Sequence, residues 1–228
     1  FDVARGRLEE LPGPAVPPPV AAVPRPAPAR ASRIVAIDAG HGGLDVGMVG
    51  PLGGRHFLRE KDVTLAVARE MAAELGRRGV RAVLTRDRDT LIALRDRGRS
   101  AGAASADIFV SIHVNAANPR WRDAAATRGY ETYYLAEART EDARRVAQME
   151  NESVRFETAA DAHNDDTLAF ILNDLAQNEH LRESSRLADA VEAQLGRVHP
   201  AEDRGVKQAG FAVLATSYMP AVLVELGF

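Results

Sequence analysis

Uninterrupted hydrophobic runs alternate with stretches of helical periodicity along most of this chain. The run Ile34–Ile37 is closed by the glycine-rich segment Asp38–Gly43, a pattern that predicts a buried strand opening into a turn. Val80–Leu84 predicts a second strand, and Ile108–Val114 is apolar on both faces apart from two polar residues. An apolar run of this two-faced kind is typical of a central strand in a parallel sheet.

Helical periodicity fills the intervals between these runs. After Asp62, a suitable N-cap, apolar residues recur at helical spacing between residues 63 and 75, and Gly79 is placed to end the helix. A shorter helical segment runs from Thr90 to about Ala103. Further strands are predicted at Tyr130–Leu135, Phe211–Leu214 and Ala221–Val224. This alternation predicts an α/β fold in which helices flank a largely parallel, twisted sheet of about six strands.

Three segments depart from the alternation. Residues 136–166 are rich in Glu, Asp, Arg and Ala and poor in large apolar side chains, which indicates an insertion. Residues 167–195 continue at mixed helical spacing but are too long for one typical helix, so we expect a break near Asn178. Residues 12–30 hold eight prolines and lack the periodicity of a core. We therefore expect a proline-rich linker at 1–30 and one catalytic domain at 31–228.

Composition narrows the classes of protein that the chain could belong to. With 46% hydrophobic and 27% charged residues, it resembles an ordinary globular domain. A net charge of −3 gives no basic field of the kind that attracts nucleic acid. No apolar stretch approaches the roughly 18 residues of a membrane span. Cysteine is absent, so a metal site would have to use His and carboxylate ligands.

Four side chains suited to metal chemistry fall where this topology brings loops together. His41 follows the first predicted strand, His113 ends the central one, and Glu225 follows the last. Ligands bind beyond the carboxyl ends of parallel strands, and Glu60 would reach the same edge from the loop before the first helix. Two imidazoles and one carboxylate match a catalytic zinc shell that leaves a fourth position to water. Glu225 would then be the general base.

The residues taken singly are also compatible with plainer roles. His113 could be a hydrogen-bonded histidine of the core, and the glycine-rich loop could be a simple turn or a phosphate-binding nest. Glu60 could be a carboxylate favoured by the helix dipole, and Glu225 could lie on the surface. The convergence of these residues on one predicted edge favours a common site.

Four ordered motifs carry a resemblance to a known family. They are Asp38–Gly47, Arg59–Val63, Ser111–Ala116 and Val224–Phe228. In this order they resemble the N-acetylmuramoyl-L-alanine amidases of the zinc-dependent bacterial cell-division type, from about residue 33 to the last residue. The resemblance implies that His41, Glu60 and His113 bind one zinc ion and that Glu225 is the catalytic glutamate.

The same resemblance implies a substrate and a cellular role. The bond would be the amide between the lactyl group of N-acetylmuramic acid and L-alanine of the stem peptide. The enzyme would act on peptidoglycan in the periplasm and release daughter cells at division. Gram-negative members resemble this chain in having an insertion that is proposed to block the site until a LytM-domain activator binds. Residues 136–175 would be this regulatory insertion.

A blocking mechanism can be stated for that insertion. A glutamate on a helix packed over the cleft could take the open zinc position and displace the water. Glu150 is the first choice for this inhibitory ligand and Glu152 is the alternative. An apolar surface in residues 168–175 could dock the activator.

Two other functions stay open at this point. The chain could hydrolyse a different murein amide with the same fold, or it could be an inactive wall-binding or divisome scaffold. The four intact site residues favour an enzyme, because a scaffold needs no general base. No pattern indicates an obligate dimer, so we expect a monomer.

Overall fold

The computed structural model describes residues 33–52, 56–118, 120–157 and 180–228. The expected proline-rich linker, the break near Asn178 and the apolar surface at 168–175 lie outside these ranges. The described residues belong to one compact unit. Within the described residues, no helix has the length and apolar character needed to cross a membrane.

A six-stranded sheet forms the centre of the domain, in the order β4-β1-β5-β8-β6-β7. All neighbouring strands run parallel except β6 and β8, which are antiparallel. The strands are β1 (Ile34–Ala39), β4 (Arg81–Leu84), β5 (Ile108–His113), β6 (Tyr130–Leu135), β7 (Asp203–Ala209) and β8 (Ala221–Glu225). The predicted α/β fold with a largely parallel sheet is confirmed.

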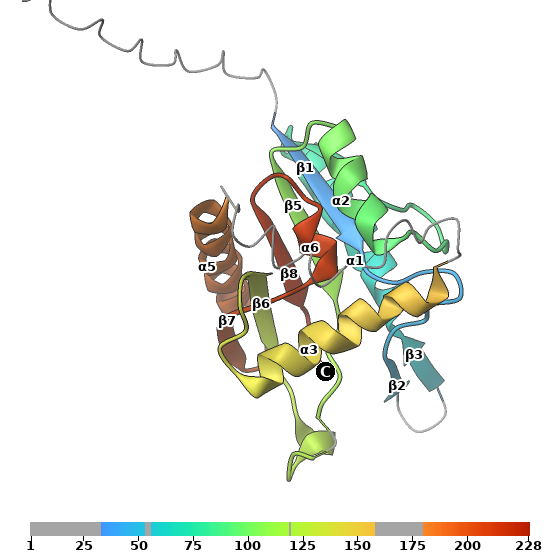
Figure 1. Ribbon diagram of the computed structural model, residues 1–228, viewed down its shortest axis with the longest axis vertical. Helices are drawn as coiled ribbons and strands as arrows, with labels where there is room; N and C mark the ends of the chain where they lie inside the picture. Colours follow the sequence, from blue (N-terminus) through green and yellow to red (C-terminus); the bar gives the residue numbers. More distant parts are fainter. Residues whose placement is uncertain (1–32, 53–55, 119, 158–179) are drawn as a thin grey trace, which may run out of the picture. The chain divides into compact units, whose positions relative to one another are not determined.

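Helices cover both faces of this sheet (Figure 1). Alternate residues of each central strand point to opposite faces, so Val35 and Ile37 of β1 enter one core while Ala36 enters the other. The first core also receives the apolar sides of α1 (Glu60–Arg77) and α5 (Leu181–Val198). The second is closed by α2 (Leu94–Ala103), α3 (Glu141–Asn151) and α6 (Ala212–Ala215). Burial on both faces explains why the central strands read as unbroken apolar runs.

Several elements differ from the expectations. Phe211–Leu214 does not form a strand, because Phe211 is the N-cap of the short helix α6 and the next four residues are helical. A buried apolar run this short is compatible with a strand or a helix, so its pattern alone does not distinguish the two. The edge strand β7 and the hairpin of β2 (Val49–Leu52) and β3 (His56–Arg59) were not predicted. The polar sequence of β7 suits an edge strand and lacks an apolar run.

Two predicted helices begin elsewhere than expected. Arg59 is the N-cap of α1, so Asp62 lies in its first turn, where a carboxylate interacts favourably with the helix dipole. This shift makes Glu60 the first residue of the helix and gives it a fixed backbone. The second helix, α2, begins at Leu94 and not at Thr90.

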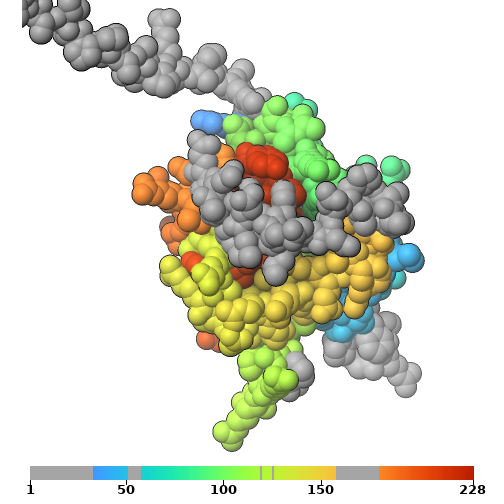
Figure 2. Space-filling view, in the orientation of Figure 1, coloured from blue at the N-terminus to red at the C-terminus, as the bar shows by residue number. Residues whose placement is uncertain are grey.

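The described part of the insertion is the amphipathic helix α3 followed by a 3₁₀ turn at Glu152–Phe156. Thr140 caps the helix, since its Oγ1 accepts a hydrogen bond of 3.1 Å from the backbone N–H of Ala143. One face of α3 is buried and consists of Ala143, Val146, Ala147 and Glu150. The helix crosses the ends of the strands that carry the candidate site (Figure 1). In the space-filling view, α3 lies along the surface of the visible face (Figure 2).

Candidate metal centre

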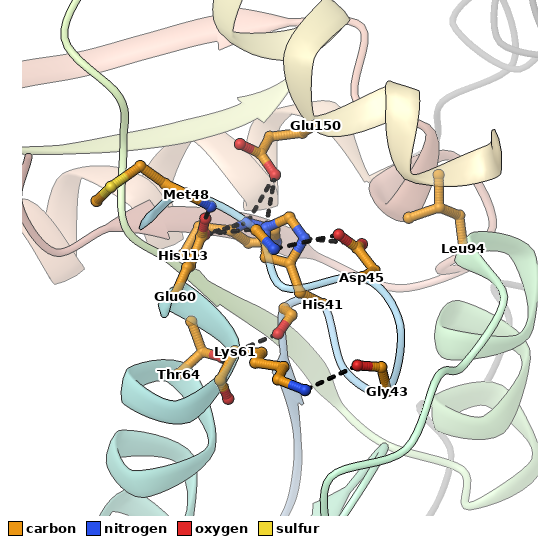
Figure 3. A network of polar contacts seen from close by, with 12 residues as sticks. His41, Gly43, Asp45, Met48, Glu60, Lys61, Thr64, Leu94, His113 and Glu150 are labelled. Carbon is orange, nitrogen blue, oxygen red and sulfur yellow. Dashed lines mark hydrogen bonds and ion pairs between the residues drawn. The ribbon is translucent and has the colours of Figure 1, made fainter. Parts of the chain in front are cut away.

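Four side chains from four separate elements meet at the carboxyl edge of the sheet (Figure 3). They are His41 after β1, Glu60 at the start of α1, His113 at the end of β5 and Glu150 of α3. One ligand atom from each lies within 4.8 Å of the others, and all four residues are buried. The structure thus brings together the predicted metal ligands and the first-choice inhibitory glutamate. Glu152, the alternative inhibitory ligand, is exposed, pairs with Arg155 and lies outside this cluster.

The spacing of these atoms fits a tetrahedral ion. Nε2 of His41 lies 3.0 Å from Oε1 of Glu60 and 3.2 Å from Oε2 of Glu150. Nδ1 of His113 lies 3.0 Å and 2.9 Å from the same two oxygens. A tetrahedron with zinc–ligand bonds of about 2.0–2.1 Å has edges of about 3.3 Å. Nε2 of His41 and Nδ1 of His113 both face the two carboxylate oxygens, so the donor set is arranged as a metal shell would be.

The charges of the cluster also fit a divalent cation. Burial lowers the pKa of His41, but the charge of Glu60 and the hydrogen bonds of Asp45 and Glu150 outweigh it and raise this pKa to about 12. The pKa of His113 rises to about 10, because Glu150 and Glu60 overcome the effect of burial. Although burial opposes it, the neighbouring histidines hold the pKa of Glu60 below its usual range. The two carboxylates therefore demand positive charge, which two protons or one divalent ion can supply.

Outer contacts fix the orientation of the ligands. Asp45 Oδ2 lies 2.8 Å from Nδ1 of His41, which turns Nε2 toward the cluster. Glu60 accepts hydrogen bonds from two backbone groups, the N–H of Met48 at 2.8 Å and that of Val114 at 2.9 Å. Asp45 lies within the first motif, but the sequence pattern predicts no role for it. Its position four residues after His41 in a glycine-rich loop was the available signal.

Two glycines are required by the close packing around the ligands. A Cβ on Gly40 would lie 2.6 Å from the His113 ring. Gly47 has φ +66°, and a Cβ there would lie 2.6 Å from both Glu60 and the His41 ring. Only glycine allows the backbone to pass so near the ligands.

Glu225 lies beside the cluster at the carboxyl edge of the sheet. It is the last residue of β8, directly opposite His113 in the strand register, and it is fully buried. Neither carboxylate oxygen has a hydrogen-bond partner among the residues that the structure describes. Burial, followed by the charges of Glu150 and Glu60, raises the pKa of Glu225 well above its usual value despite an opposing effect of His113. The carboxyl group therefore favours the proton-holding form while Glu150 is in place.

Fold and site together define a class: an α/β domain with two histidines and two carboxylates buried at the carboxyl edge of a mainly parallel sheet. Residues 35–228 match the family described as N-acetylmuramoyl-L-alanine amidase. The chain belongs to this family, as its motifs indicated.

Individual relatives agree with this placement. The chain is 33% identical over 199 residues to N-acetylmuramoyl-L-alanine amidase AmiA of Escherichia coli, covering 86% of this chain and 65% of the relative. It is 35% identical to AmiC of Neisseria meningitidis, covering 90% of this chain and 48% of the relative. The crystal structure of the amidase from Clostridium difficile superposes with a TM-score of 0.60 at 29% identity, covering 86% and 80% of the two chains. The chain thus spans about half to two thirds of the length of these curated relatives.

The Asp45 contact predicts a loss of metal affinity in Asp45→Asn. Asparagine keeps the size of the side chain but removes the charge that orients and polarises the His41 ring. Zinc affinity, measured by competition with a chelator, should fall about 10–100-fold. Asp87→Asn is the control, because Asp87 is exposed and its side chain pairs only loosely with Arg88 at 3.8 Å. Equal affinities of the Asp45 variant and wild type would contradict the orienting role.

The raised histidine pKa values predict that metal binding releases protons. Near neutral pH both imidazoles of the metal-free cluster are protonated, because their pKa values of about 12 and about 10 lie above that pH. A metal must displace these protons, so its apparent affinity rises with pH and falls on acidification. Calorimetry in buffers of different ionisation enthalpy should report about two protons released per ion. A release near zero, or an affinity that is independent of pH, would contradict the charge balance.

Proposed function

We propose that this chain is a zinc-dependent N-acetylmuramoyl-L-alanine amidase. The observation that carries the proposal is the buried cluster of His41, Glu60, His113 and Glu150, whose donor atoms have the spacing of a zinc shell and lie next to Glu225. Family membership and the names of the relatives support the reaction. The substrate is the amide between the lactyl group of N-acetylmuramic acid and L-alanine in peptidoglycan.

The site residues divide the chemistry between holding a cation and moving a proton. His41, Glu60 and His113 would hold the zinc, which would supply a Lewis acid to polarise the carbonyl and to make a water more acidic. Glu225 accepts the proton of the attacking water and delivers it to the amide nitrogen as the carbon–nitrogen bond breaks. The products are the lactyl carboxylate on the sugar and the free amino group of L-alanine.

Glu150 supports an autoinhibited state. One oxygen of Glu150 contacts both histidines, at 2.9 Å and 3.2 Å, and so takes the position that water needs in a catalytic shell. Its charge also raises the pKa of Glu225, which opposes the ionised form required of a base. The Glu150 carboxylate therefore opposes both the binding of the attacking water and the ionisation of Glu225.

Specific contacts hold α3 in this blocking position. Asn151 donates a hydrogen bond to the carbonyl of Gly210 and accepts one from the N–H of Ala212, each 2.8 Å long. Arg145 donates to the carbonyl of Ala116 at 3.1 Å. We propose that an activator, of the LytM-domain type implied by the resemblance, displaces these contacts. Action in the periplasm during daughter-cell separation belongs to the same proposal, with residues 136–175 as the regulatory insertion.

Product analysis of digested murein tests the proposed reaction. Wild type, or Glu150→Ala if wild type is closed, should release stem peptides with a free L-alanine amino group and leave glycan without peptide. Glu225→Gln has nearly the same shape but cannot accept the proton, so it should lose at least about 100-fold in rate. Products that still join sugar to peptide, or undiminished activity of Glu225→Gln, would contradict the proposal. An inactive scaffold would release nothing in any variant.

Removing the blocking carboxylate should raise activity. We expect Glu150→Ala to digest murein about 10–100-fold faster than wild type without an activator, since a charge-assisted contact contributes about 1.5–3 kcal/mol to the closed state. Its pH profile should extend to lower pH, because the pKa of Glu225 falls when the neighbouring charge is removed. Glu152→Ala is the matched control, for its exposed side chain lies outside the cluster. Equal rates for Glu150→Ala, Glu152→Ala and wild type would refute autoinhibition by Glu150.

A further inference from the structure

A buried ion pair lies beneath the candidate metal centre. Arg97 of α2 donates from Nη1 to Oδ1 of Asp38 at 2.9 Å, and both side chains are almost fully shielded from solvent. Asp38 is held in turn by the hydroxyls of Thr85 at 2.6 Å and Ser111 at 2.7 Å. Burial opposes ionisation of Asp38, but Arg97 and these hydroxyls keep its pKa below the usual value. The guanidinium is therefore fixed in place by Asp38 of β1, which is itself held by Ser111 of β5 and by Thr85 directly after β4.

The other donors of Arg97 reach the backbone that carries His41. Nη1 donates to the carbonyl of Ala39 at 2.8 Å, and Nη2 donates to the carbonyl of His41 itself at 3.0 Å. Nε donates to the carbonyl of Ile92 at 3.0 Å, which ties the arginine to the segment before α2. One rigid guanidinium thus links Asp38 at the end of β1 to the metal-ligand loop.

His41 needs such support because its backbone is in the left-handed region. Its φ is +60°, a conformation that few residues other than glycine adopt and that costs about 1 kcal/mol or more. The turn points the imidazole back toward the cluster (Figure 3). The preceding carbonyl, of Gly40, is held separately by Arg86 at 2.8 Å and by Thr64 at 2.9 Å. Arg97 is therefore the side chain that fixes the carbonyl of the strained residue.

We propose that Arg97 is a positioning residue for the metal centre: its guanidinium, anchored by Asp38, holds the left-handed turn at His41 and so presets the direction of Nε2. This inference rests on the proposed zinc site. A merely structural ion pair would change the stability of the fold but leave the zinc affinity of the folded protein as it is. A positioning role changes the affinity and the geometry of the bound ion.

Arg97→Lys separates the two roles. Lysine keeps the positive charge beside Asp38, but its ammonium cannot present the planar fork that reaches the carbonyls of Ala39 and His41 together. Ser184→Ala is the matched control. Ser184 is also buried and accepts a 3.0 Å hydrogen bond from the N–H of Ala221, at the opposite end of β8 from Glu225. This control weakens the fold without touching the loop.

The readouts are the melting temperature without metal, the zinc affinity from chelator competition and the visible spectrum of the Co²⁺-loaded protein. Arg97→Lys should bind zinc about 10–100-fold more weakly and show an altered Co²⁺ spectrum. Ser184→Ala should melt earlier yet keep the wild-type affinity and spectrum. Should Arg97→Lys fail to fold, the charge-neutral pair Asp38→Asn with Arg97→Gln replaces it, and the same loss of affinity is expected.

The outcomes separate this inference from the proposed function. A folded Arg97 variant with wild-type affinity and spectrum overturns the positioning role and leaves the amidase proposal intact. Weakened binding, together with no murein cleavage by the Glu150→Ala form, would support the positioning role and count against the amidase. A wild-type chain that binds no zinc overturns both.

Discussion

Charge balance inside one buried cluster is the constraint on which the site depends. His41, Glu60, His113 and Glu150 are each exposed by 6% or less, and two carboxylates in such surroundings are costly unless positive charge lies among them. In the metal-free state the histidines supply it as protons, which is why their pKa values rise to about 12 and about 10. A divalent cation supplies the same charge at the centre of the four ligands. The arrangement is therefore matched to a metal by electrostatics as well as by distance.

Much of the surrounding fold positions these four side chains relative to one another. The ends of β1 and β5 bring His41 and His113 to one edge, and the start of α1 adds Glu60. Glycines at 40 and 47 let the backbone lie against the ligand rings. Glu150 differs from the other three, because it comes from α3 of the insertion and not from the ends of β1 and β5 or the start of α1. A ligand on a separately docked helix can be withdrawn while the remaining shell stays in place.

The sequence is most informative about the central strands and about the polar side chains at or beside their ends. The central strands could be predicted because they are buried on both faces, and His41, Glu60, His113 and Glu225 because each lies at or beside such an element. The edge strand β7 could not, since most of its residues are polar and only partly buried, and the short apolar run at Phe211 fits a helix as well as a strand.

Supporting residues were harder to find than the ligands. Arg97 contacts the carbonyl of His41, which lies 56 positions away in the sequence, and no local sequence pattern predicts such a contact. Its surroundings, a short helix rich in arginine, are typical of an exposed surface. No local signal in the sequence separates Glu150 from Glu152. The fold does, because Glu150 lies on the buried face of α3. Positions of this kind depend on tertiary packing.

The central claim is that His41, Glu60, His113 and Glu150 together form one zinc shell. X-ray absorption at the zinc edge of the loaded protein tests it most directly. The account predicts four nitrogen and oxygen neighbours at about 2.0–2.1 Å in wild type, two of them imidazoles, with a water replacing one carboxylate in Glu150→Ala. A wild-type spectrum with fewer than two imidazole ligands, or one that Glu150→Ala leaves unchanged, would contradict it.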